Sequence, residues 1–80
     1  MVEWRFLTSW PGVEPLEIGG LRVWDLEWRQ TGEGISVPDP QYGNLRGPPV
    51  YEIGPEEAPV RFAAEEVSNG VFCFWIPDEP

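Results

Sequence analysis

Apolar and polar residues alternate at the start of the chain, which is the pattern of a strand with one buried face. Within residues 2–8, Trp4 and Phe6 would lie on one face, and Arg5 and Leu7 on the other. We therefore expect a half-buried strand over this segment.

Residues 9–19 contain a Trp-Pro-Gly sequence that ends the alternation, so an irregular loop is expected there. A second alternation follows, with Trp24 and Trp28 on one face and Asp25 on the other. A helix would also bring the two tryptophans together, but it would place Asp25 on their side. Because tryptophan and valine favour strands, we expect a strand that includes residues 24–28.

The chain is expected to turn back after this strand. The Thr-Gly-Glu-Gly sequence at residues 31–34 has the composition of a turn. Residues 35–37 would then return as a short strand, with Trp28 opposite Val37. Residues 38–49 hold four prolines and two glycines. This density predicts an extended surface loop, either a functional one or a clamp over one face of a sheet.

The strongest turn signal is Asn69-Gly70, because both residues tolerate positive φ and stand between two apolar segments. Residues 60–67 fit strand spacing as well as helix spacing, and a glycine can also end a helix. We expect a hairpin, with residues 71–76 as its second strand. A two-residue turn would place Val67 opposite Phe72, Glu65 opposite Phe74 and Ala63 opposite Ile76.

Ten prolines and nine glycines interrupt the 80 residues, so long helices are not expected. A chain of this length forms one small domain, over residues 1–80. With a further short strand at residues 50–53, the expected fold class is all-β. It would be a small antiparallel curved sheet or open barrel of five to six short strands. The alternative is an α+β fold in which residues 56–69 are helical.

The expected strand at residues 71–76 is apolar on both faces. One face of a small antiparallel sheet normally contacts water, so the second face needs a cover. The loop with Trp10, the loop at residues 38–49, closure into a barrel or a second copy of the chain would each supply one. A homodimer through the 71–76 strand is therefore one expected arrangement.

The charge of the chain is strongly negative and restricts its partners. Fourteen acidic residues and five arginines give −9, and residues 31–80, with nine acidic residues and two arginines, contribute −7 of this. Such a surface repels phosphates and anionic lipids, so direct nucleic-acid binding and membrane binding are not expected. It would attract a basic protein, although net charge also keeps a small aromatic protein soluble.

The residue types that most often carry catalysis or bind metals are scarce. Histidine is absent and Cys73 is the single cysteine, which argues against His-based catalysis, internal disulfides and thiolate metal sites. The aromatic neighbours of Cys73 favour a buried structural thiol. Asp25 and Glu27 would share a strand face, but Arg29 beside them favours a solvated face over a catalytic pair. We expect no catalytic residue, no metal and no cofactor, and an enzyme that uses only carboxylates is the least favoured function.

The N-terminus shows no basic region followed by an apolar stretch, so no export signal is expected. The longest apolar run, residues 71–76, is far shorter than the roughly 20 residues that span a bilayer. Together with one unpaired cysteine, these features predict a cytoplasmic protein.

These features favour a non-catalytic binding or accessory protein that interacts with another protein, a basic one. Trp10 and Tyr42 stand in expected loops, where aromatic rings can recognise cations, and Glu56 and Glu57 add acidic side chains. These four residues form the expected binding site. The alternative is an acidic inhibitor or immunity-type protein that imitates nucleic-acid phosphates.

Overall fold

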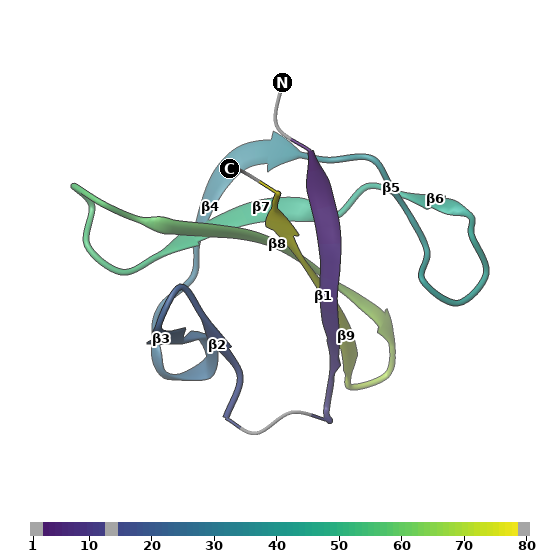
Figure 1. Ribbon diagram of the computed structural model, residues 1–80, viewed down its shortest axis with the longest axis horizontal. Helices are drawn as coiled ribbons and strands as arrows, with labels where there is room; N and C mark the ends of the chain where they lie inside the picture. Colours follow the sequence, from purple (N-terminus) through teal and green to yellow (C-terminus); the bar gives the residue numbers. More distant parts are fainter. Residues whose placement is uncertain (1–2, 13–14, 79–80) are drawn as a thin grey trace.

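The chain folds around a five-stranded antiparallel sheet, with two smaller two-stranded sheets beside it (Figure 1). The structure is a computed structural model that describes residues 3–12 and 15–78. Its strands and one 3-10 turn, η1, are in chain order β1 (Trp4–Trp10), β2 (Glu17–Ile18), β3 (Leu21–Arg22), η1 (Val23–Asp25), β4 (Arg29–Gly34), β5 (Val37–Pro38), β6 (Leu45–Arg46), β7 (Pro49–Ile53), β8 (Val60–Ser68) and β9 (Val71–Pro77).

The large sheet has the strand order β1-β9-β8-β7-β4, and every neighbouring pair is antiparallel. It is curved but stays open, with β1 and β4 as its edges (Figure 1). The all-β prediction is confirmed. The alternative with a helix over residues 56–69 is wrong, because residues 60–68 form β8.

β1 confirms the predicted N-terminal strand and extends it to Trp10. A register shift between Phe6 and Thr8, in its pairing with β9, breaks the simple alternation around Leu7. As a result Leu7 and Trp10 pack on the same core, although they are three positions apart and would lie on opposite faces of a regular strand. Val2, which was included in the predicted strand, lies outside the described residues.

The hairpin predicted around Asn69-Gly70 is present, and Gly70 has the expected positive φ of 77°. Ser68 pairs with Val71 as a two-residue turn requires, but a register shift at Val67 then moves every later pair by one position. The predicted pairs of Val67 with Phe72, Glu65 with Phe74 and Ala63 with Ile76 are therefore wrong. The observed pairs are Glu66 with Phe72, Glu65 with Cys73, Ala64 with Phe74 and Ala63 with Trp75.

This shift has a physical reason, because one residue of slip exchanges the faces of a strand. The predicted register would place the Glu65 carboxylate beside Phe74, whose side chain is fully buried. The observed register places Glu65 opposite Cys73, and there its carboxylate reaches Arg46.

The strand predicted to include residues 24–28 does not form, and η1 occupies its start. Val23 is fully buried, and the Trp28 indole N–H donates a hydrogen bond of 2.7 Å to its carbonyl. The Trp24 and Trp28 rings lie 5.0 Å apart. A continuous strand would separate these residues by about 13 Å, at about 3.3 Å per residue. The helical alternative, which brings Trp24 and Trp28 together, was thus closer to the observed contact than the predicted strand.

The turn predicted at residues 31–34 is also wrong, because these residues lie within β4, where the register with β7 shifts and Gly34 pairs with Pro49. Trp28 and Val37 do not pair either. Trp28 packs on one core and Val37 belongs to the other. The predicted loop at residues 38–49 contains most of a small hairpin, in which β5 pairs with β6.

Two cores lie on the two faces of the large sheet, because successive side chains of β9 point to opposite sides. The first core consists of Leu16, Ile18, Val23, Ile53, Phe62, Ala64 and Phe74. The second core consists of Val37, Val50, Ala63, Cys73 and Trp75.

The chain's own segments therefore cover both faces of β9. Residues 15–28 supply the cover of the first core, and the segment with β5 and β6 lies over the second. Cys73, Phe74 and Trp75 are at most 3% exposed, so these three side chains offer no dimer contact. None of the described residues forms a helix long and apolar enough to cross a membrane.

Candidate functional site

An open pocket of about 600 Å³ lies between the β5–β6 hairpin and the face of the sheet that carries the second core. This volume is within the range of small-ligand pockets in proteins. The sheet contributes Phe6, Ser9, Val67, Ser68, Val71 and Cys73, and the hairpin contributes Asp39, Pro40, Gln41, Tyr42 and Arg46.

Asp39 shapes the hairpin side of the pocket. Its Oδ1 accepts the backbone N–H groups of Gln41 and Tyr42, at 2.7 and 2.9 Å. This is the local bonding by which an aspartate stabilises a turn. The Asp39 backbone adds a 2.9 Å bond from the Gly43 N–H, and Gly43 takes the positive φ, of 80°, that suits glycine.

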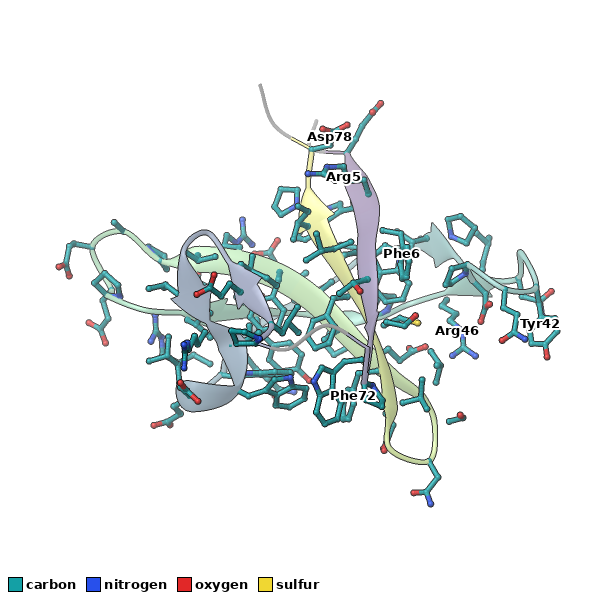
Figure 2. The ribbon with its side chains drawn as sticks, turned by 60° about the horizontal axis from the view of Figure 1, so that its bottom comes forward. Arg5, Phe6, Tyr42, Arg46, Phe72 and Asp78 are labelled. Atoms are coloured by element: carbon teal, nitrogen blue, oxygen red, sulfur yellow. The ribbon has the colours of Figure 1, made fainter. Side chains whose placement is uncertain are left out.

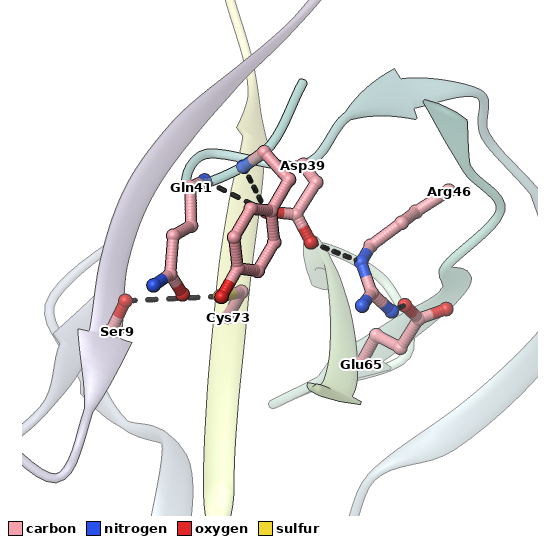
Figure 3. Close-up of polar contacts among 7 residues, drawn as sticks. Ser9, Asp39, Gln41, Arg46, Glu65 and Cys73 are labelled. Atoms are coloured by element: carbon pink, nitrogen blue, oxygen red, sulfur yellow. Dashed lines mark hydrogen bonds and ion pairs between the residues drawn. The ribbon is translucent and has the colours of Figure 1, made fainter. Parts of the chain in front are cut away.

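Arg46 connects this turn to the sheet. Its Nε donates to Asp39 Oδ2 at 2.5 Å, and its Nη1 donates to Glu65 Oε1 on β8 (Figure 3). The Asp39 side chain is 7% exposed, against 31% for Arg46 and 25% for Glu65. The three groups therefore form a half-buried network that fixes the hairpin over the sheet.

This network carries one positive and two negative charges, a net −1. The hydrogen bond from Arg46, followed by those from the Tyr42 and Gln41 N–H groups, lowers the pKa of Asp39. The hydrogen bonds to Asp39 and Glu65 raise the pKa of Arg46. Asp39 is therefore held ionised at neutral pH, and its carboxylate is unsuited to donate a proton.

Two exposed aromatic rings stand at the pocket. Phe6 is 40% exposed and makes an edge-to-face contact of 6.0 Å with Trp75. Tyr42 is 74% exposed, and within the described residues its side chain has no ring partner and no hydrogen bond. Figure 2 shows Tyr42 at the end of the hairpin, away from the main sheet. These two rings are accessible to a ligand, whereas the aromatic rings of the cores are buried.

The floor of the pocket includes Cys73, which is 3% exposed. Its Sγ lies 3.7 Å from the Ser9 Oγ (Figure 3). The thiol is free and buried, in the setting that the sequence predicted. Ser9 is exposed and brings a hydroxyl to the pocket.

The four residues predicted to form a binding site are not brought together. Tyr42 lines the pocket. Trp10 ends β1 and packs on the first core, with its ring 4.9 Å from that of Trp24. Glu56 and Glu57 are exposed in the turn between β7 and β8, which lies at the opposite end of the molecule from the β5–β6 hairpin (Figure 1).

Sequence reasoning missed Asp39, Arg46, Glu65 and Phe6. An aspartate four residues before a glycine, between prolines, is a turn signal that could have identified Asp39. The alternation predicted the strand face of Phe6 but not that β1 is an edge strand. This edge position leaves the Phe6 ring partly exposed.

The carboxylate pair considered in the sequence has no shared strand face. Asp25 lies in η1 and forms an exposed ion pair of 3.9 Å with Arg22, while Glu27 lies beyond the turn. In residues 3–12 and 15–78 no three Cys, Asp or Glu side chains gather closely enough to hold a metal ion.

Comparison with known proteins gives no relative. No family model matches the chain, and neither the curated proteins nor the solved structures contain a match.

Proposed function

We propose that this chain is a non-catalytic binding protein whose partner is a basic protein. The observation that carries the proposal is that most of its positive charges are paired within the molecule. Four of the five arginines form ion pairs within the molecule: Arg5 with Asp78, Arg22 with Asp25, Arg46 with Asp39 and Glu65, and Arg61 with Glu33 and Glu52.

The unpaired charge at the surface is consequently mostly acidic, since Arg29 is the one described arginine without an ion pair and is half-buried. Six carboxylates of the described residues are exposed and have no ion pair there: Glu3, Glu17, Glu27, Glu56, Glu57 and Glu66. An excess of one sign at the surface accelerates the approach of a partner with the opposite sign and disfavours like-charged partners. With a net charge of −9, the favoured partner is basic.

The pocket supports binding rather than catalysis. A general acid needs a pKa raised toward neutral pH, whereas the pKa of Asp39 is lowered. Glu65, the other carboxylate of this network, is paired with the same arginine. The exposed rings of Phe6 and Tyr42 are, by contrast, suited to contact a partner.

Imitation of nucleic-acid phosphates remains the alternative hypothesis. It would require the carboxylates of residues 52–66 and 78–79 to form one stripe. Asp78 forms an ion pair with Arg5, and Glu79 lies outside the described residues. Glu65 and Glu66 point to opposite faces of β8, and Glu52 is 3.7 Å from Arg61. The structure therefore gives this alternative no specific support.

The test is a titration of the protein with a blocked peptide that alternates arginine and glycine, and with a matched peptide in which glutamate replaces arginine. At about 20 mM salt we expect binding of the arginine peptide alone, and weaker binding at about 300 mM, where the Debye length is shorter. Absence of binding at low salt, or equal binding of both peptides, would contradict the proposal. Competition between a bound basic protein and DNA would support the alternative.

A further inference from the structure

We propose that the pocket between the β5–β6 hairpin and the sheet receives the guanidinium group of an arginine side chain from the basic partner. The inference rests on the proposed function and adds the place and the chemistry of recognition. The lining contributes the Phe6 and Tyr42 rings, the Ser9 hydroxyl, Asp39 and Arg46. Glu65 on β8 is not part of the lining, but its carboxylate binds Arg46.

The charge of the site selects a cation. Among the described residues, Arg46 is the one positive group of the pocket lining, and two carboxylates already bind it. The network therefore keeps a net −1 and does not offer a free guanidinium to an anion. The acidic net charge of the whole molecule adds to this selection, because it repels anions and concentrates cations around the molecule.

The aromatic rings select a cation that can stack. A cation above the face of a tyrosine or phenylalanine ring is attracted by the ring electrons. Tyr42 is the most accessible of the large aromatic residues that the structure describes as exposed, and Phe6 lines the same pocket. Both rings are exposed and line the pocket.

Arginine fits this arrangement better than lysine does. Its planar guanidinium stacks on a ring while its N–H groups donate in the plane, whereas the ammonium of lysine is a compact and strongly hydrated charge. The acceptors in the pocket lining include the Ser9 hydroxyl, the Gln41 side-chain amide and the Asp39 carboxylate. A pocket of about 600 Å³ also leaves room for partner residues beside the arginine.

The experiment follows the backbone amide signals of the ¹⁵N-labelled protein during titration with three blocked tripeptides at low salt. Their central residues are arginine, lysine and citrulline, which has the shape of arginine without its charge. We expect the arginine peptide to bind more tightly than the lysine peptide, and the citrulline peptide to bind least. The shifted signals should belong to Ser9, Gln41, Tyr42 and their neighbours.

Two variants of the same hairpin provide the matched comparison. Tyr42→Ala should weaken arginine binding about threefold or more, from the size of a cation–π contact at an exposed site. Tyr42→Phe keeps the ring and should bind like the native protein. Leu45→Ala is the control, since Leu45 is 76% exposed on the hairpin and outside the pocket lining, and it should leave binding unchanged.

The possible failures are distinguishable. If the arginine peptide binds but shifts only signals elsewhere, such as those of residues 54–59, the pocket assignment is overturned and the proposed function stands. Equal binding of the citrulline peptide, or unchanged binding by Tyr42→Ala, also overturns the assignment. If neither charged peptide binds at any surface at low salt, both the assignment and the proposed function fail.

Discussion

At the scale of single residues, the Asp39 carboxylate forms more hydrogen bonds than any other side chain described at the site. It accepts two backbone N–H groups and the Arg46 guanidinium, and it is 7% exposed. A carboxylate with three donors is strongly favoured in its charged form. The geometry of the hairpin therefore depends on the ionisation of this one group.

Asp39→Asn should lower the stability of the folded protein at pH 7, and the stability difference from the native protein should depend on pH. The lowered pKa of Asp39 in the folded state means that its contribution is present above the unfolded pKa of about 3.9 and is lost as pH falls through the folded value. Thermal unfolding of both proteins should therefore show a Tm difference that narrows in acid. An equal difference at pH 7 and in strong acid would show that the charge of Asp39 is irrelevant.

Gly70 is required for its backbone conformation rather than for space. Its φ is 77°, and an added Cβ would meet no atom within 4 Å. Gly70→Val should therefore cost about 1–3 kcal/mol from backbone strain alone. Gly70→Asn should cost less, because asparagine tolerates positive φ. Chemical denaturation measures both, and an unchanged stability of the valine variant would contradict the assignment.

At the scale of elements, the sequence predicted those strands whose turn chemistry is local. Asn69-Gly70 identified the β8–β9 hairpin, and the short strand predicted at residues 50–53 is present in β7. The register was not predictable, because the shift at Val67 depends on contact between Glu65 and a distant arginine.

The strand prediction that included residues 24–28 was wrong for a related reason. Its alternation suggested a strand, but the burial of Val23 and the indole hydrogen bond of Trp28 favour a 3-10 turn. The burial of Val23 is a tertiary effect, whereas the indole bond is local and spans five residues. Together they override the local preference for a strand. The four-residue spacing of Trp24 and Trp28 was the signal that the chain bends here.

Trp28→Phe tests the importance of this turn. The change removes the N–H that bonds the Val23 carbonyl at 2.7 Å, and it should cost about 1–3 kcal/mol. For a chain of this size, each kcal/mol lowers the Tm by about 4–8 °C. Trp24→Phe is the control, since Trp24 is 41% exposed, and it should cost about 1 kcal/mol or less. A larger loss for Trp24→Phe would refute this account of the turn.

At the scale of the whole molecule, the two faces of the large sheet differ: one carries the larger aromatic core, and the other carries the pocket. The first core lies under residues 15–28 and contains most of the aromatic rings that contact one another, in tilted or edge-to-face pairs. The second face carries a smaller core and leaves room for the pocket. The sequence could identify Tyr42 as an exposed ring, but not its neighbours. Arg46 meets Glu65 across 19 residues of sequence, through a docked hairpin that the pattern does not reveal.

The burial of β9 also bears on self-association. The central side chains of residues 73–75 are inside, so any homodimer would have to use other surfaces. Because each copy carries −9, such a dimer should tighten from low to moderate salt as repulsion is screened. A complex with a basic partner should loosen over the same range. Light scattering after size exclusion at two salt concentrations checks both signs, and a dimer that dissociates with added salt would contradict this view.

The most direct test of the central claim is to locate the bound arginine by nuclear Overhauser contacts between the protein and the arginine tripeptide. The account predicts contacts from the arginine δ-methylene protons to the ring protons of Tyr42 and Phe6. Contacts confined to the turn between β7 and β8, or to the edge strand β4, would contradict it.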